Sequence, residues 1–244
     1  MKVIILIDGQ NLYYGLKDLR INEWDINWKR FFHSLLAPND ELLRTYWFRP
    51  QRLLDTYYTD HNIRHSICFK KYRNHLNRFT NDQQLVPESI LHSIEQEAIS
   101  IESWIKQVKE KFNQSEYKYD QISLVYGDIE IVKTGVVKID PFKRLFLGEK
   151  GVDISLAVKM ISLSVQKRCD KIILISGDYD YAEAIKFVKD NMTKIHLVKL
   201  HKGFPPKNKS VSRDLAVLSD KVLDVYESDL RQNFLKMVSV PGLQ

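Results

Sequence analysis

The chain has 244 residues, with 37 lysines and arginines against 31 aspartates and glutamates, a formal net charge of +6. A chain of this length can bury a large core without disulfides, and its 44% hydrophobic and 28% charged residues exclude a disordered or fibrous protein. The first apolar run is too short for a secretory signal, no run is long enough to span a membrane, and only two cysteines are present. We therefore expect a cytoplasmic protein with no membrane association.

Apolar runs and amphipathic stretches alternate along most of the chain. The run Val3–Ile7 predicts a buried strand, followed by a helix over about 12–20 that Asn11 caps. Further strands are predicted at Leu42–Phe48, Ile122–Tyr126, Lys171–Ile175 and Lys194–Lys199, an extended piece at Ile129–Ile139, and helices at Gly151–Val165 and Tyr181–Lys189. This alternation favours an α/β fold with a mainly parallel central sheet covered by helices on both faces.

A heptad stripe interrupts that alternation and predicts a long helix over 87–112. The stripe consists of Leu91, Ile94, Ala98, Ile101, Ile105, Val108 and Phe112. It can form a homodimer seam with a second copy, or it can pack along its own domain or against a helix predicted at about 70–80. We expect one domain over 1–228 with a helical insertion at about 73–118, followed by a C-terminal tail at 229–244.

The positive charge is concentrated in two stretches. Residues 44–79 carry a local charge of +6 and residues 199–213 carry +5, so the rest of the chain sums to −5. The first stretch mixes its cations with aromatic rings, a combination that suits single-stranded RNA. Arg49, Lys70, Lys71 and Arg73 are the cations we expect to bind substrate, and the second stretch, which contains Gly203, Pro205 and Pro206, predicts a loop.

Aspartates stand where chemistry gathers in a parallel sheet, at the carboxyl ends of strands and the starts of helices. Asp8 follows the first strand, Asp178 and Asp180 follow the strand 171–175, and Asp153 lies in the first turn of a predicted helix. Each has an ordinary structural explanation as a turn or capping residue. Together they would repel one another unless a cation neutralised them, and carboxylates are the ligands that Mg²⁺ and Mn²⁺ prefer.

Three motifs, in this order and spacing, resemble a known family. They are Ile-Asp8-Gly-Gln-Asn11-Leu-Tyr, Lys150-Gly-Val-Asp153-Ile-Ser-Leu-Ala-Val and Ile-Ser176-Gly-Asp178-Tyr-Asp180-Tyr. They are similar to the NYN domain, in the LabA-like branch of the PIN-like nuclease superfamily. The stretch Ser212–Asp220 also resembles the closing helix of that family.

The resemblance implies a three-layer α/β/α PIN-like, Rossmann-like domain and a metal-dependent ribonuclease activity. By motif position, Asp8, Asp153, Asp178 and Asp180 would be the catalytic and metal-binding carboxylates, with Mg²⁺ or Mn²⁺ as cofactor. Asn11 would orient Asp8 or the substrate, Ser176 would support the pocket, and Lys150 would contact the substrate. The partner is expected to be RNA in single-stranded regions.

Two other functions remain open on the sequence. One is a non-catalytic RNA-binding or regulatory module of the same fold, because a sequence does not show that the four carboxylates converge. The other is a phosphatase of the haloacid dehalogenase type, which also places an aspartate after its first strand. That chemistry requires a second aspartate two positions later, where this chain has Gln10.

Overall fold

The computed structural model describes residues 1–55, 63–72, 74, 86–207 and 211–236, and it divides into two compact units. Unit 1 comprises Met1–Arg49, Asp120–Gly135 and Gly151–Gln244, and unit 2 comprises Pro50–Tyr119 and Val136–Lys150. The predicted insertion at about 73–118 falls inside unit 2, which begins earlier and takes in a second segment of the chain. In the described part of the chain, no helix has the length and apolar character needed to cross a membrane.

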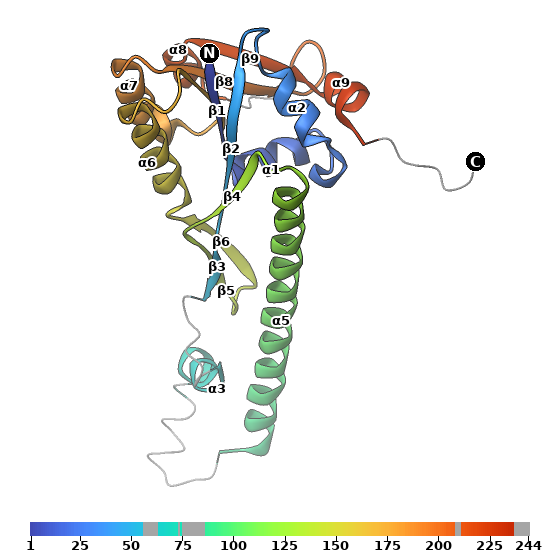
Figure 1. Cartoon of the computed structure of the whole chain (residues 1–244). Helices are drawn as coiled ribbons and strands as arrows, with labels where there is room; N and C mark the ends of the chain where they lie inside the picture. The colour runs from blue at the N-terminus through green and yellow to red at the C-terminus, as the bar shows by residue number, and fades with distance from the viewer. Residues whose placement is uncertain (56–62, 73, 75–85, 208–210, 237–244) are drawn as a thin grey trace, which may run out of the picture. The chain divides into compact units, whose positions relative to one another are not determined.

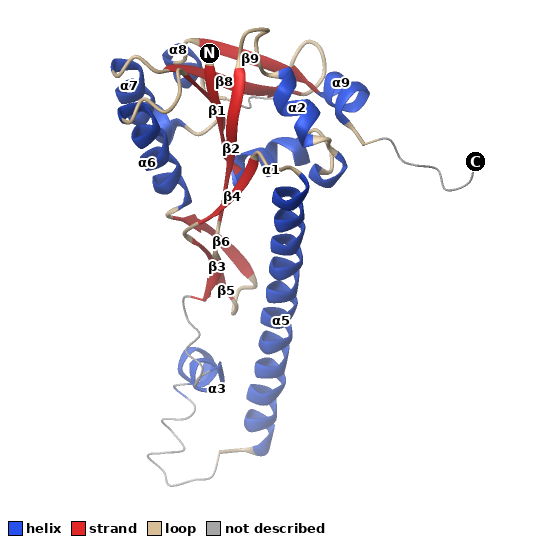
Figure 2. Cartoon of the chain, in the orientation of Figure 1, coloured by secondary structure: helices blue, strands red, loops and turns tan. Residues whose placement is uncertain are grey.

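Helices and strands alternate in unit 1, as Figures 1 and 2 show. Its elements are β1 (Lys2–Asp8), α1 (Gly9–Asp18), α2 (Trp28–Ser34), β2 (Glu41–Arg49), β4 (Ile129–Lys133), α6 (Val152–Val165), β7 (Lys171–Ile175), α7 (Ala182–Asp190), β8 (Lys194–His201), α8 (Arg213–Leu218), β9 (Lys221–Tyr226) and α9 (Glu227–Asp229), with 3-10 turns at Glu23–Asp25 and Tyr179–Tyr181 and a π-helical turn at Leu230–Phe234. The strands predicted at Val3–Ile7, Leu42–Phe48, Lys171–Ile175 and Lys194–Lys199 correspond to β1, β2, β7 and β8 and are confirmed.

The strands of unit 1 form a parallel sheet in the order β4-β2-β1-β7-β8-β9, six strands among the described residues. Helices α1 and α2 cover one face and α6, α7 and α8 the other (Figure 1), so the predicted three-layer α/β/α architecture is confirmed. The strand order reverses direction between β1 and β7. A crevice at such a reversal, outside the carboxyl ends of the strands, is where parallel sheets place their ligands.

The core of unit 1 lies between this sheet and its helices. β7 is buried along its whole length, and β1 is buried from Val3 to Asp8, which fits strands covered on both faces. Leu156 and Met160 of α6 and Ile185 of α7 are fully buried against one face. β1, which ends at Asp8, and β7, which leads into Ser176, are thus both part of the core.

Unit 2 contains β3 (Arg52–Asp55), β5 (Val136–Asp140) and β6 (Leu145–Lys150), helix α3 (Ile63–Ile67) with a π-helical turn at Cys68–Tyr72, and most of α5 (Glu88–Val125). β3 pairs with β5 in parallel and β5 with β6 in antiparallel. The heptad positions Ile94, Ala98, Ile101 and Ile105 are buried and pack with residues of α3. The stripe therefore packs within its own unit, as one of the two alternatives predicted, and the homodimer stays an untested prediction.

The predicted strand at Ile122–Tyr126 is wrong, because α5 continues to Val125. Short aliphatic runs do not distinguish a strand from the end of a helix by periodicity alone. Burial does: Tyr119 and Ile122 are buried, whereas Leu124 and Val125 are exposed, a one-sided pattern typical of a helix.

Two further predictions about the ends of elements need correction. The cap of α1 is Asp8 rather than Asn11, and the helix begins at Gly9. The C-terminal tail was expected from residue 229, but Leu230 is buried, the Arg231 guanidinium donates to the Leu19 carbonyl, and Ile26 pairs with Leu235. The tail prediction is therefore corrected for 229–235, and residues 237–244 lie outside those described.

Candidate active site

Asp8 ends β1 and begins α1, so one carboxylate belongs to the core strand and to the helix start. Its Oδ1 accepts the backbone N–H of Asn11 at 3.0 Å, which caps the helix. Its Oδ2 accepts the Ser176 hydroxyl at 3.0 Å and the Tyr181 hydroxyl at 3.3 Å. Asp8 is only 3% exposed, and burial is the main reason that its pKa is raised above the ordinary 3.8.

Gly9 lets α1 start directly against β2. A Cβ built on Gly9 would lie 2.5 Å from the Phe48 carbonyl oxygen and 3.1 Å from Cγ of Arg49. The Asp8-Gly9 pair is therefore not a turn. It joins β1 directly to α1, at a point where the backbone of Gly9 lies close to that of Phe48 in β2. The same contact places the Arg49 side chain beside the residue that follows Asp8.

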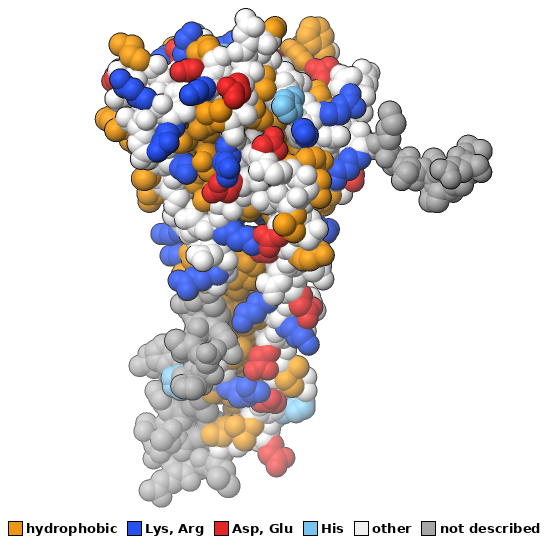
Figure 3. All heavy atoms as spheres, in the orientation of Figure 1, with side chains coloured by type: hydrophobic (Ala, Val, Ile, Leu, Met, Phe, Trp, Pro, Cys, Tyr) orange, Lys and Arg blue, Asp and Glu red, His pale blue; other side chains and the backbone are white. Residues whose placement is uncertain are grey.

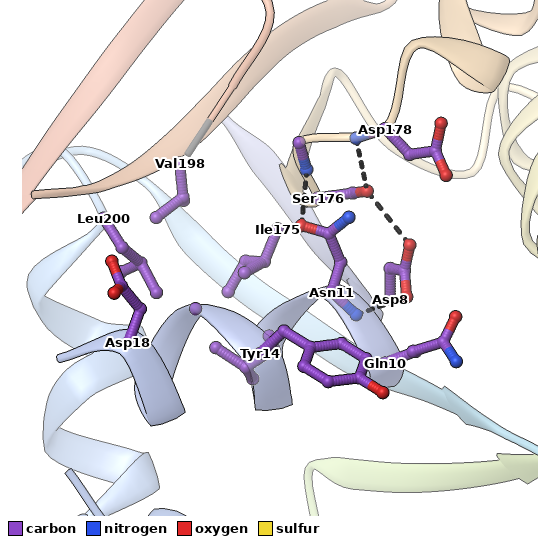
Figure 4. A pocket seen from close by; sticks show the side chains of 13 residues that line it. Asp8, Gln10, Asn11, Tyr14, Asp18, Ile175, Ser176, Asp178, Val198 and Leu200 are labelled. Carbon is purple, nitrogen blue, oxygen red and sulfur yellow. Dashed lines mark hydrogen bonds between the residues drawn. The ribbon is translucent and has the colours of Figure 1, made fainter. Parts of the chain in front are cut away.

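The loop after β7 is tied to both Asp8 and α1 (Figure 4). The Ser176 hydroxyl donates to Asp8 and accepts the backbone N–H of Asp178 at 3.1 Å. The Asn11 side-chain oxygen accepts the Gly177 backbone N–H at 2.9 Å. Ser176 and Asn11 thus hold the loop in place through their side chains.

Tyr181 joins two of the predicted carboxylates, and sequence reasoning did not identify it. Its hydroxyl lies 3.3 Å from Asp8 Oδ2 and 3.1 Å from Asp153 Oδ1. Tyr181 itself is 1% exposed, and burial together with the two carboxylates raises the pKa of its hydroxyl far above the ordinary value. The hydroxyl is therefore a fixed proton donor. A tyrosine directly after the Asp-Tyr-Asp motif was the available signal.

Asp153 lies in the first turn of α6. Gly151, at a φ of +86°, turns the chain into this helix in a left-handed conformation that favours glycine. Burial, and after it repulsion from Asp178 and Asp180, raises the pKa of Asp153, and the Tyr181 hydroxyl opposes this rise. Asp178 in turn accepts the Asp180 backbone N–H at 3.0 Å. Asp153 thus interacts electrostatically with each of the other three predicted carboxylates.

A cavity of about 490 Å³ opens beside Asp8 between α1 and the ends of β7 and β8. Its polar lining comes from Asp8, Asn11, Ser176 and Asp178, together with Gln10, Tyr14 and Asp18, and its apolar wall from Ile175, Val198 and Leu200 (Figure 4). Gln10 and Tyr14 are further residues that sequence reasoning missed. The cavity lies at the reversal of strand order, where the topology predicts a ligand.

The carboxylates suit a divalent cation chemically, because oxygen ligands are what Mg²⁺ and Mn²⁺ prefer. No cation is among the described groups that set the pKa of Asp153. Across the described ranges, however, no three His, Cys, Asp or Glu side chains gather closely enough to form a complete metal site. The carboxylates are thus the right type of ligand for the ion. In this structure their positions are fixed by hydrogen bonds to other groups of the protein.

Of the predicted substrate cations, Arg49 lies beside Gly9 in unit 1, whereas Lys70, Lys71 and Lys150 belong to unit 2. Lys150 is the exposed last residue of β6, in unit 2. Lys71 pairs with Glu97, and the Lys70 ammonium lies 3.9 Å from the centre of the Phe142 ring. Arg73 falls outside the described residues. In the second basic stretch, β8 extends to His201 and Lys202 pairs with Asp18, so the predicted loop starts later than Lys199.

A parallel α/β/α sheet with acidic residues at the carboxyl ends of β1 and β7 is the architecture of a PIN-like domain. The NYN domain family model matches residues 2–224, and the chain belongs to this family of PIN-like nucleases. A comparison with curated proteins gives no match. Among solved structures, a Vibrio parahaemolyticus protein of unknown function is similar at 14% identity over 92% of each chain, with a TM-score of 0.46.

Proposed function

We propose that the protein is a metal-dependent endoribonuclease that hydrolyses RNA phosphodiester bonds, with Mg²⁺ or Mn²⁺ held by Asp8, Asp153, Asp178 and Asp180. The proposal includes its place in the LabA-like branch of the NYN family. The observation that carries it is the Tyr181 hydroxyl, which bonds to both Asp8 and Asp153 while Asp178 and Asp180 repel Asp153. Such mutual repulsion is costly without a cation.

A bound divalent ion supplies an activated water and offsets the charge that develops on the phosphodiester. The chain's own residues hold the carboxylates ready for that chemistry. Ser176 and Tyr181 donate to Asp8, and Asn11 ties α1 to the loop that carries Asp178. The adjoining cavity supports the proposal, because its exposed Tyr14 ring and apolar wall offer surfaces on which a nucleotide can stack.

A second function, a non-catalytic RNA-binding or regulatory module, is supported by a different observation. Both oxygens of Asp8 are engaged by donors of the protein itself, and the described residues contain no complete metal cluster. Together with the Tyr181 hydroxyl, these donors occupy three of the roughly four lone-pair sites of the Asp8 carboxylate, so an ion would compete with them for Asp8. The haloacid-dehalogenase alternative has no such support, because the chain belongs to the NYN family and has Gln10 where a second aspartate is needed.

The two proposals are distinguished by cleavage of end-labelled single-stranded RNA by purified protein. We expect cleavage in Mg²⁺ or Mn²⁺, its loss in EDTA, and a loss of at least about 100-fold in Asp8→Asn and Asp178→Asn. Asp190→Asn, an exposed carboxylate at the end of α7, is the matched control and should cleave like the wild type. Cleavage that persists in both site variants contradicts the nuclease proposal. Binding of Mn²⁺ by calorimetry in the wild type, lost in Asp153→Asn, is the second measurement, and its absence favours the non-catalytic module.

A further inference from the structure

A second hollow, of about 830 Å³, lies on unit 1 away from the acidic site. It is bounded by the first halves of β1 and β2 and by the end of α6, and its lining is mainly polar. Five cations surround it: Lys2 of β1, Arg44 of β2, Lys159 of α6, and Lys167 and Arg168 directly after α6. Figure 3 shows Lys and Arg side chains, with Asp and Glu between them, on the surface of unit 1. We call this group the basic hollow.

The positive charge of the basic hollow is largely uncompensated. In the described part of the chain, Arg44 alone among the five cations forms a salt bridge, with Glu130 at 3.0 Å, and both of these side chains are about half exposed. Two further acids are near: Asp170, whose carboxylate accepts the backbone N–H of Lys2, and Glu41, which pairs in register with Lys2 across β1 and β2. Exposed pairs of this kind contribute little and leave the cations available to an anion.

The end of α6 does not by itself explain the cluster. A helix C-terminus favours cations, which accounts for Lys167 and Arg168 after Val165. It does not account for Lys2 and Arg44, which come from two strands, or for Lys159, a turn and a half before the helix end. Side chains from three separate elements converge on the same hollow, and this convergence points to an anionic ligand.

The shape and lining of the hollow indicate which anion. Its lining includes one aromatic ring, Tyr46, and the Lys159 ammonium already lies 4.1 Å from the centre of that ring. The ammonium occupies the face of the ring on which a nucleobase would stack. We therefore expect the hollow to bind an anion through charge and not to distinguish one base from another. A concave, charged surface fits a linear polyanion better than a flat membrane surface, to which proteins bind by inserting apolar side chains.

We propose that the basic hollow binds the phosphate backbone of single-stranded RNA without regard to base sequence, at a surface separate from the acidic site. Lys2 and Asp8 stand at opposite ends of β1, roughly 20 Å apart at about 3.3 Å per residue. α6 runs between the same two regions, with Asp153 in its first turn and the hollow beside its last. The hollow is thus a binding surface that acts independently of cleavage.

The test measures binding of fluorescently labelled oligo(A) and oligo(U) by anisotropy in EDTA, over 50 to 200 mM NaCl, so that no metal-dependent cleavage takes place. For single strands, the slope of log affinity against log salt is about −0.7 per phosphate contact. We expect Lys167→Gln/Arg168→Gln to reduce that slope by about 1.4, and Lys159→Gln by about 0.7, equally for both oligonucleotides.

The control removes the same charges at another exposed place in unit 1. Lys29→Gln/Arg30→Gln on α2 also replaces an adjacent lysine and arginine, and should leave the slope unchanged. Melting curves verify that each variant folds, and Lys159→Gln keeps the test valid if the double variant does not. Hollow variants that bind like the control, or a slope change confined to one base sequence, overturn the proposal. So does binding to phosphatidylserine vesicles in place of RNA.

The outcome is separable from the nuclease proposal. A wild-type protein that binds RNA as expected but cleaves none contradicts the nuclease and leaves the basic hollow intact. Cleavage by a protein whose hollow variants bind like the wild type contradicts the hollow alone.

Discussion

Replacing Asp153 with asparagine should stabilise the metal-free protein, because the carboxylates of the acidic site repel one another. The Tyr181 hydroxyl lies 3.3 Å from Asp8 Oδ2 and 3.1 Å from Asp153 Oδ1, so these two oxygens are at most about 6.4 Å apart. At an effective dielectric constant of about 20, unit charges at that distance repel by about 2.5 kcal/mol. Asparagine has nearly the same shape and keeps an oxygen that accepts the Tyr181 hydroxyl.

Two favourable interactions of the Asp153 charge oppose this gain. One is the hydrogen bond from the Tyr181 hydroxyl, which is worth about 1 kcal/mol more to a charged oxygen than to an amide oxygen. The other is the helix dipole, because Asp153 lies in the first turn of α6, where a negative charge contributes roughly 0.3–1 kcal/mol. The net stabilisation of Asp153→Asn is therefore about 0.5–1 kcal/mol near neutral pH, or about 1 to 4 °C in Tm for a chain of this size. Repulsion from Asp178 and Asp180 adds to it.

The effect should depend on pH with a definite sign. Burial and the neighbouring carboxylates raise the pKa of Asp153 above its ordinary 3.8, so the folded state binds the proton more tightly than the unfolded state does. Wild-type stability then falls as pH rises through the folded-state pKa, and the advantage of Asp153→Asn grows over the same interval. Below pH 3.8 the advantage is absent, because both states carry the proton.

Thermal melts in EDTA between pH 4.5 and 7.5 measure this difference, with the exposed Asp190→Asn as the control that should not shift. Added Mn²⁺ should raise the Tm of the wild type more than that of Asp153→Asn, because an ion that binds only the folded state stabilises it. A lower Tm for Asp153→Asn at pH 7, or a difference that does not change with pH, would refute the repulsion argument.

Two further predictions concern packing. Gly9→Ala should destabilise unit 1 by about 1–3 kcal/mol, because the new Cβ would meet the Phe48 carbonyl oxygen at 2.5 Å. Urea unfolding measures it, with Gly127→Ala, which has open space around it, as the control; equal effects at both positions contradict the packing argument. Ile101→Ala should cost about 2–5 kcal/mol in the same assay, because Ile101 is 2% exposed. Ile99→Ala, 49% exposed on the same helix, should cost under about 1 kcal/mol, and a comparable loss there shows that the heptad face is not the buried one.

Much of the fold follows from local patterns along the chain. Continuous apolar runs such as Val3–Ile7 and Lys171–Ile175 predict strands buried on both faces, and unit 1 has them at these positions. The heptad stripe predicts the long helix, and its positions from Ile94 to Ile105 are buried in unit 2, whereas Leu91 at its start is exposed. The strand predictions hold because a strand covered on both faces needs apolar side chains at successive positions. The helix prediction holds because a helix covered on one face needs them every three or four residues. At Ile122–Tyr126 the prediction fails, because a five-residue segment with three aliphatic side chains fits a helix end as well as a strand.

The sequence by itself places acidic residues at strand and helix ends and, by resemblance, assigns them to one family. It does not show what brings them together. Tertiary structure decides that Asp8 caps α1, that Asn11 binds the next loop, and that the Tyr181 hydroxyl bonds to two carboxylates 145 positions apart in the chain, Asp8 and Asp153. It also gathers Lys2, Arg44 and the end of α6 into the basic hollow. The physical reason is that hydrogen bonds and charge clusters depend on side-chain positions in space, which the order of strands in the sheet determines and local periodicity does not.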